Sequence, residues 1–301
     1  MAHLVQQVLN AVQLGSVYAL IALGYTMVYG ILRLINFAHG DIFMAGAYFG
    51  LFAAGFLQSR IQAPSWVTLA LTMVASMIAT SGLAVLIERV AYKPLRNAPR
   101  VSLVITALGT GLFLENFTLA TMGAEPRKMP EIVRVSNLDL GGVTVSTVQL
   151  LIILVSLLLM IVLDTIVRKT MTGMAMRAIS FDKAVTQLMG VPLDRIISLT
   201  FAIGSSVAAA GGILYGLAYP VIDPYMGIRI GWWAFIAAVV GGIGNVRGAM
   251  VGAYILGFVE IFTPLILPSF TYRDFVAFSL LLLFLVFKPT GILGRPTAQK
   301  V

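Results

Sequence analysis

The sequence has no cysteine, only two histidines and few charged residues, and each scarcity excludes a kind of protein. Without cysteine the chain forms no disulfide and no thiolate metal site, and the widely separated His3 and His39 do not make a metal-ligand cluster. No Gly-x-x-x-x-Gly-Lys-Ser/Thr loop is present to cradle nucleotide phosphates. No Ser/His/Asp arrangement indicates hydrolysis. Charged residues make up 11% of the chain, against about 25% in soluble domains.

What the chain has instead is apolar sequence. Apolar residues account for 59% of it and the mean hydropathy is +0.97, which indicates a polytopic membrane protein. The net charge of +8 does not indicate nucleic-acid binding, because most charges flank apolar runs, and membrane topology explains the bias. A bilayer core of about 30 Å requires roughly 20 apolar residues in a helix. The candidate spans are Leu9–Leu32, Ile42–Gln58, Ser65–Ile87, Val101–Met122, Thr147–Leu163, Ile196–Tyr219, Ile230–Val240, Ala249–Leu267 and Phe275–Phe287.

These runs predict an all-α, polytopic transmembrane helix bundle of about eight or nine spans. The seventh and ninth runs are short, so either is a candidate half-helix. We expect a single transmembrane domain over residues 1–301. Met44–Tyr48 resembles Met250–Tyr254, and each follows a glycine-containing break. This short match leaves open whether the chain contains two related halves, a common plan among transporters, or whether the match is chance.

The basic residues predict the orientation. They collect in residues 89–100, in residues 168–195 and after Phe287 (Lys288, Arg295, Lys300), and such segments are usually cytoplasmic. Nine crossings then place the C-terminus in the cytoplasm and the N-terminus outside. Residues 123–146 become an outer, periplasmic loop. In that loop the β-branched runs at 132–135 and 143–145 flank turn-forming residues, which predicts a small hairpin.

Polar residues interrupt the apolar sequence in two places, Asn36–Asp41 and Gly241–Asn245. Polar groups and irregular backbone at membrane depth are tolerated only against protein or a water-filled path. The first cluster is either a short break between crossings or an unwound part of one, with Asp41 near a helix start. We expect the translocation pathway to include Asn36, His39, Gly40, Asp41, Gly46, Glu115, Gly241, Gly242, Gly244 and Asn245.

Two acidic residues, Glu115 and Glu260, lie far from any expected span end and must face protein or water. Either they couple transport to protons, or each forms a buried hydrogen bond with a neighbouring helix. The second reading is favoured. Three small-xxx-small pairs favour tight helix packing over a direct substrate role: Gly46/Gly50, Gly212/Gly216 and Gly248/Gly252.

The basic loop 168–195 contains a predicted short helix. Asp182 can cap it, Gly190 ends it and Pro192 keeps it from resuming. Its apolar residues Ala184, Val185, Leu188 and Met189 form one stripe at helical spacing. Such a face either docks into a partner's groove or lies on its own bundle or on the membrane surface.

The chain resembles the permease subunits of bacterial branched-chain amino acid ABC importers, specifically the LivH type. The resemblance covers nearly the whole length. Its carriers are Gly15–Leu20, Asn36–Asp41 continuing through Gly46–Tyr48, Glu88–Arg96, and Gly241–Asn245 continuing through Gly248–Ala249.

The resemblance implies a multi-pass subunit of the bacterial inner membrane, not an enzyme, that moves leucine, isoleucine or valine into the cytoplasm. It implies no cofactor in this chain, with ATP bound by two cytoplasmic ATPase subunits. It also implies a second permease subunit of the LivM type, a periplasmic substrate-binding protein, surrounding lipid and no nucleic acid. An ion-coupled secondary transporter is the first alternative. The second is a permease of the same family for urea, amides or other amino acids.

The resemblance further implies that the 168–195 loop is the coupling loop that rests on an ATPase. Importer permeases generally carry Glu-Ala-Ala and then Gly there. Aligned on Gly190, this chain has Ala184, Val185 and Thr186 instead, so the position of the loop supports coupling better than its residues do. The residues expected to couple are Arg177, Asp182, Ala184, Val185, Leu188, Met189 and Gly190.

Overall fold

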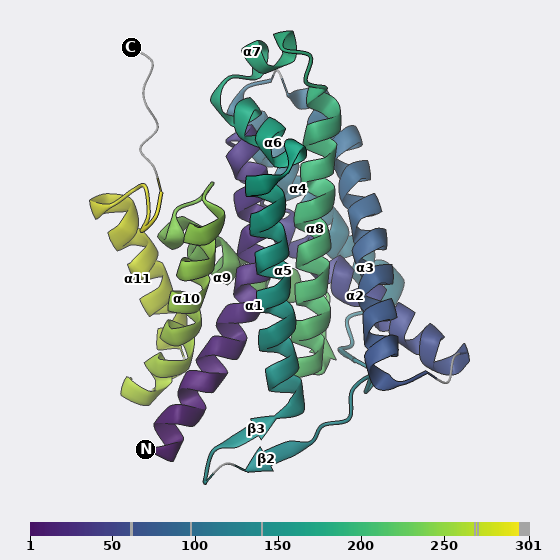
Figure 1. The fold of residues 1–301 in the computed structure, drawn as a ribbon, viewed down its shortest axis with the longest axis vertical. Helices are drawn as coiled ribbons and strands as arrows, with labels where there is room; N and C mark the ends of the chain where they lie inside the picture. Colours follow the sequence, from purple (N-terminus) through teal and green to yellow (C-terminus); the bar gives the residue numbers. More distant parts are fainter. Residues whose placement is uncertain (61–62, 97, 140, 268, 270, 295–301) are drawn as a thin grey trace.

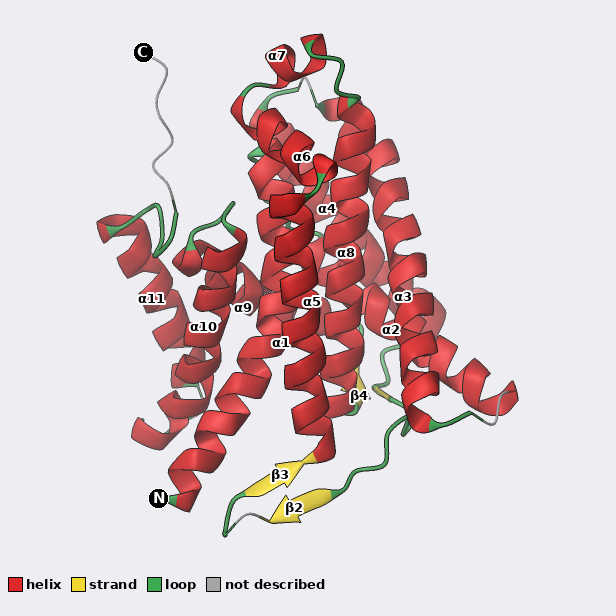
Figure 2. Ribbon diagram, in the orientation of Figure 1, coloured by secondary structure: helices red, strands yellow, loops and turns green. Residues whose placement is uncertain are grey.

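The computed structural model describes residues 1–301 except 61–62, 97, 140, 268, 270 and 295–301. The described residues form a bundle of helices with two small strand pairs (Figures 1 and 2). The helices are α1 (Ala2–Leu32), α2 (His39–Arg60), α3 (Ser65–Ile87), α4 (Arg100–Met122), α5 (Thr147–Lys169), α6 (Met171–Phe181), α7 (Lys183–Leu188), α8 (Leu193–Ala218), α9 (Met226–Gly241), α10 (Val246–Ile266) and α11 (Tyr272–Phe287). A π-helical turn, Glu88–Tyr92, and a 3-10 turn, Lys93–Leu95, extend α3.

The prediction of an all-α polytopic bundle is confirmed, and each of the nine apolar runs coincides with a helix. In the described part of the chain, 7 helices are long and apolar enough to cross a membrane. The other two runs correspond to α9 and α11, which have 16 residues each. At 1.5 Å per residue such a helix is about 24 Å long, shorter than a bilayer core of about 30 Å. The prediction that these two are short is therefore confirmed.

The predicted hairpin exists, but the position of its first strand was wrong. β2 (Asn137–Asp139) pairs antiparallel with β3 (Thr144–Ser146), whereas the first strand was expected at 132–135. Asp139 Oδ1 accepts a hydrogen bond from Gly142 N at 2.9 Å, which closes the turn immediately after β2. Ile132 is instead buried in the protein. A second pair, β1 (Arg127–Lys128) with β4 (Val221–Ile222), fastens the same loop to the α8–α9 connection.

Helix α1 lies at the centre of the bundle. It is apolar on every side and packs mainly against α10 and α8, with further contacts to α5 and α9. A helix that is hydrophobic all round is a buried helix, and residues 14–28 of α1 are accordingly buried. By contrast, α3, α4 and α5 each expose an apolar face to the surroundings.

Three of the paired glycines, Gly46, Gly50 and Gly212, lie in the contact between α2 and α8. Gly46 and Gly50 of α2 face Ala209 and Ile213 of α8, and a Cβ on Gly46 would lie 2.7 Å from the Cα of Ala209. In return, Gly212 of α8 faces the backbone of α2. The absent side chains let the two backbones approach closely, which confirms the packing interpretation.

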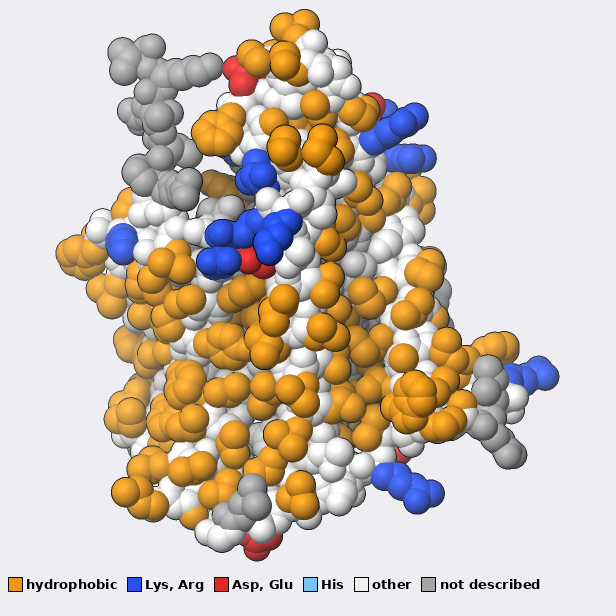
Figure 3. All heavy atoms as spheres, viewed as in Figure 1, with side chains coloured by type: hydrophobic (Ala, Val, Ile, Leu, Met, Phe, Trp, Pro, Cys, Tyr) orange, Lys and Arg blue, Asp and Glu red, His pale blue; other side chains and the backbone are white. Residues whose placement is uncertain are grey.

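The two ends of the bundle differ. The N-terminus and the β2–β3 hairpin lie at one end, and α7 lies at the other (Figure 1). On the face shown in Figure 3, most Lys and Arg side chains lie in the half that carries α7. Of the predicted basic C-terminal cluster, Arg295 and Lys300 lie outside the described residues.

Candidate functional site

The polar cluster after α1 is a break that turns back into the bundle. Arg33 ends α1 in the left-handed conformation (φ 54°), and α2 starts at His39. The ring of His39 packs against Gly24. A Cβ added to Gly24 would lie 2.0 Å from the Nε2 atom of His39. Gly24 precedes the end of α1 by eight residues, about 12 Å along the helix axis. The chain therefore re-enters the protein before α2 begins.

Three polar side chains of this break are buried, namely Asn36, His39 and Asp41. Tyr92 Oη donates a hydrogen bond to Asn36 Oδ1 at 2.5 Å. The edge of the Tyr25 ring meets the His39 ring with centroids 4.9 Å apart. The His39 ring interacts with the backbone of Ile21 in α1, whereas Asp41 Oδ1 has no hydrogen-bond partner among the described residues. Buried polar atoms without partners are rare in native proteins, so this cluster is the leading candidate site.

Asp41 lies in a cradle made by glycines of two other helices. A Cβ on Gly111 of α4 would lie 2.4 Å from Asp41 Oδ2, and one on Gly227 of α9 would lie 2.6 Å from Oδ1. Glu115, four residues after Gly111 and on the same face of α4, is half-buried and interacts electrostatically with Asp41. Asp41 lies in the first turn of α2, as expected, where the helix dipole favours negative charge.

The Gly241–Asn245 segment forms a separate tight turn between α9 and α10. Asn245 Oδ1 caps α10 by accepting from Arg247 N at 3.1 Å, and its Nδ2 atom donates to Leu293 O at 2.6 Å. Gly242 and Gly244 have positive φ, which makes the turn tight. A Cβ on Gly244 would lie 3.6 Å from the Tyr29 ring of α1.

The expected pathway residues therefore fall into three places. Asn36 to Asp41 lie with Glu115 between α2, α4 and α9, and the Gly241–Asn245 turn packs on α10 and the segment after α11. Gly46 lies in the α2–α8 contact, where its carbonyl accepts from Ser76 Oγ at 2.7 Å. Two helices connect the first two groups: α1 touches them through Gly24 and Gly30, and α9 packs on Asp41 through Gly227 and ends at Gly241.

The expected coupling loop contains the predicted short helix. Asp182 Oδ1 accepts hydrogen bonds from Ala184 N and Val185 N at 3.0 and 3.1 Å, and Gly190 follows with φ 82°. The predicted cap and stop of α7 are thereby confirmed. Leu188 and Met189 are 87% and 79% exposed. The alternative that this stripe lies on its own bundle is therefore wrong.

Other contacts hold the loop in place and make its surroundings positive. Arg177 of α6 donates to the Val167 carbonyl at the end of α5. Burial, together with Arg96, Arg100 and Arg33, lowers the pKa of Lys183.

One polar cluster was missed in the sequence, and a second contains Glu260, which the sequence had singled out without its partners. The buried Glu88 binds Arg96 and accepts from Ser198 Oγ at 2.6 Å. Its position inside the Glu88–Arg96 motif was the available signal. At the opposite end, Glu260 accepts from Tyr18 Oη and pairs with Arg273 at 3.5 Å. The hydrogen bond to α1 confirms the favoured reading of Glu260.

Comparison with known proteins identifies close relatives over the full length. The family model for the permease component of branched-chain amino acid transport systems matches residues 7–285. The high-affinity branched-chain amino acid transport system permease protein LivH of Salmonella typhimurium is 42% identical over 99% of this chain and 98% of its own. LivH of Escherichia coli K12 shows the same values, and BraD of Pseudomonas aeruginosa is 41% identical over the same shares.

The fold has a counterpart among solved structures. A metal-chelate type ABC transporter in an inward-facing conformation aligns with a TM-score of 0.52 at 15% identity, covering 94% of this chain and 84% of the other. At that identity the likeness concerns the fold alone.

Proposed function

The chain belongs to the family of permease components of branched-chain amino acid transport systems, and we propose that it is the membrane-spanning subunit of an ATP-driven importer that carries leucine, isoleucine or valine into the cytoplasm. The full-length identity to LivH and BraD carries this proposal. The seven long apolar helices and the family place the chain in the inner membrane as a multi-pass protein.

The proposal assigns ATP hydrolysis and substrate capture to other subunits. Two ATPases bind ATP, and one of them docks on the exposed apolar face of α7. A second permease of the LivM type completes the conduit, and a periplasmic protein delivers the amino acid. The observation that favours this division is α7 itself, because a solvent-exposed apolar stripe on a capped helix fits a partner's groove.

The orientation follows from charge. The basic residues on the α7 side support a cytoplasmic location for that end, and the proposal then has the hairpin and the N-terminus outside. Since the natural chain has no cysteine, single-cysteine variants need no background removal. We expect a membrane-impermeant maleimide to label Leu138→Cys in intact cells but Gln187→Cys only after the inner membrane is opened. Reversed labelling would contradict the orientation.

The Asp41 cluster is the proposed point of contact with the substrate. An amino acid crossing the membrane carries a positive ammonium group, and a buried carboxylate offsets the cost of removing it from water. Asp41 Oδ1 is buried and unpartnered among the described residues, with Glu115 nearby. The glycines at 111 and 227 let the backbones of α4 and α9 pack closely against the carboxylate, so the proposal requires α4 or α9 to move before a ligand reaches Asp41.

We expect Asp41→Asn, which keeps the shape and removes the charge, to lower leucine uptake about tenfold, the value of 1.4 kcal/mol of lost interaction. The measurement is initial uptake of radiolabelled leucine into proteoliposomes containing the assembled transporter. Glu125→Gln, an exposed carboxylate at the hairpin end, is the matched control and should leave uptake unchanged. Unchanged uptake in Asp41→Asn would remove this residue from the pathway.

The main rival is a secondary transporter driven by an ion gradient. The experiment that separates the two uses the purified full chain with its copurifying subunits in liposomes. We expect leucine uptake to follow internal ATP and to be insensitive to proton and sodium ionophores. Uptake by this chain alone, driven by an ion gradient, would reject the importer proposal. Arginine or urea in place of leucine tests the other same-family substrates.

A further inference from the structure

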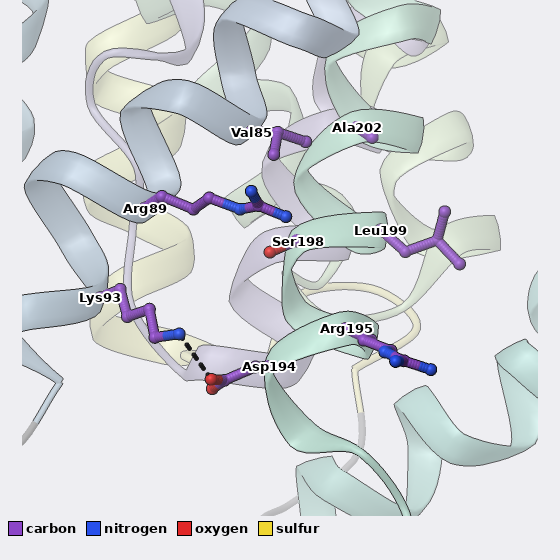
Figure 4. A pocket seen from close by; sticks show the side chains of 8 residues that line it. All are labelled: Val85, Arg89, Lys93, Asp194, Arg195, Ser198, Leu199 and Ala202. Carbon is purple, nitrogen blue, oxygen red and sulfur yellow. Dashed lines mark ion pairs between the residues drawn. The ribbon is translucent and has the colours of Figure 1, made fainter.

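An open cavity of about 590 Å³ lies at the end of the bundle that carries α7. Neither Asp41 nor any residue of α7 lines it. The end of α3 and its π-helical turn form one wall, and the first turns of α8 form the other (Figure 4). Its lining consists of three basic residues, one acid, one hydroxyl and three apolar side chains: Arg89, Lys93, Arg195, Asp194, Ser198, Val85, Leu199 and Ala202.

The charges in this cavity are unbalanced. Its one acid, Asp194, is already paired, with Lys93 at 2.6 Å and with Arg96 at 2.5 Å. Among the described residues, neither Arg89 nor Arg195 forms an ion pair. In Figure 4 the guanidinium of Arg89 reaches from the α3 side toward Ser198 of α8. Two arginines therefore remain available to an anion that enters from outside the protein.

The surroundings of the cavity are apolar on the side toward the membrane. Leu86, Val90 and Leu199 are 59%, 69% and 41% exposed, and Val85 and Ala202 extend the apolar wall. The cavity thus joins a positive region, at the end of two helices long and apolar enough to span a membrane, to an exposed apolar surface. A ligand that fits both parts carries an anionic head and an apolar tail.

Ordinary snorkelling does not account for this arrangement. Single Lys or Arg residues near helix ends extend to the interface one by one. Here cationic side chains come from segments about one hundred residues apart in the sequence, and they share a cavity with a serine. Basic pockets between transmembrane helices on the cytoplasmic side are typical binding places for anionic lipid headgroups.

We propose that this cavity binds the phosphate of an anionic phospholipid, with Arg89 contacting the phosphate beside Ser198, Arg195 adding positive charge from the α8 side, and an acyl chain lying along Val85, Leu199 and Ala202. Arginine suits this role because its planar guanidinium can donate two hydrogen bonds to a phosphate.

The test is native mass spectrometry of the purified full chain, titrated with phosphatidylglycerol or, separately, with phosphatidylcholine. We expect the wild type to prefer phosphatidylglycerol, and Arg89→Gln/Arg195→Gln to bind it about tenfold or more weakly, since each basic residue near a membrane surface contributes on the order of 1 kcal/mol. The control, Arg100→Gln/Lys169→Gln, removes the same charge from the same end but outside the cavity. It should bind phosphatidylglycerol like the wild type.

Three results would overturn the proposal. One is equal binding of the two lipids by the wild type, and another is an equal loss in the control, which would reduce the effect to net charge. The third arm adds millimolar inorganic phosphate. If phosphate displaces phosphatidylglycerol completely, the cavity holds a free phosphate and the lipid assignment fails. If the Arg89/Arg195 variant does not fold, Arg89→Lys, which keeps the charge but loses the paired donors, should still weaken phosphatidylglycerol binding, and unchanged binding would count against the site.

Discussion

Replacing Leu188 and Met189 by serine is expected to lower ATP-driven leucine uptake at least about tenfold while leaving the permease folded in the membrane. The two side chains are 87% and 79% exposed, so the bundle itself loses almost no packing, and exposed substitutions usually change stability by about 0.5 kcal/mol or less. An ATPase that buries them would lose two apolar contacts, and fully burying a Leu or Met side chain contributes about 1.5–3 kcal/mol.

The measurement has two readouts: uptake into proteoliposomes, and the amount of ATPase that copurifies with the tagged chain. Gln187→Ser is the matched control, because it changes an exposed polar residue on the same short helix. The thermal midpoint of the purified permease should stay within about 2 °C of the wild type for both variants. Full uptake in the double variant would show that α7 does not transmit the ATPase movement.

The second large effect is expected at the α9–α10 contact. A Cβ on Gly252 would lie 2.0 Å from the Ala237 carbonyl oxygen and 2.6 Å from Gly241 N. Both obstacles are backbone atoms, so Gly252→Ala forces the two helices apart. Overpacking of this kind costs about 1–3 kcal/mol, sometimes more. We expect the midpoint of thermal unfolding in detergent, followed by tryptophan fluorescence, to fall by about 5 °C or more.

Gly109→Ala in α4 provides the comparison for that variant. No atom lies within 4 Å of the Cβ that it would add, and alanine is the better helix former. Its unfolding midpoint should equal that of the wild type or slightly exceed it. If the two alanine variants were equally stable, the close approach of α9 and α10 at Gly252 would not contribute to stability.

Local sequence predicted most of the helices because each one is marked by its own residues. The nine apolar runs, the short α9 and α11, and the cap and stop of α7 at Asp182 and Gly190 all depend on neighbours in sequence. The hairpin shows the limit of such signals. The β-branched run at 132–135 has strand propensity, but Ile132 is buried in the bundle instead of pairing with a strand. The pairing of β2 with β3 begins at Asn137.

The candidate site was predicted only in part. The polar residues Asn36, His39 and Asp41 are conspicuous in an apolar sequence, and their grouping in one break follows from their short spacing. That Gly111 and Gly227 enclose Asp41, or that Tyr92 holds Asn36, depends on contacts between residues separated by tens to nearly two hundred positions. No local pattern specifies such contacts. The same holds for Tyr18 with Glu260 and for the basic cavity.

The sequence alone determined that this protein is a multi-spanning helical membrane protein, since in lipid every backbone polar group must be bonded within its own helix and the length of each apolar run sets the span. It also determined where the capped helix of the basic loop would form. Only the tertiary structure decided which polar groups are buried without partners, which glycines are contact points between backbones, and which arginines share a cavity. Those properties arise only when separate helices pack. Small side chains are compatible with many pairwise helix contacts, so the contacts that form depend on the packing of the whole bundle.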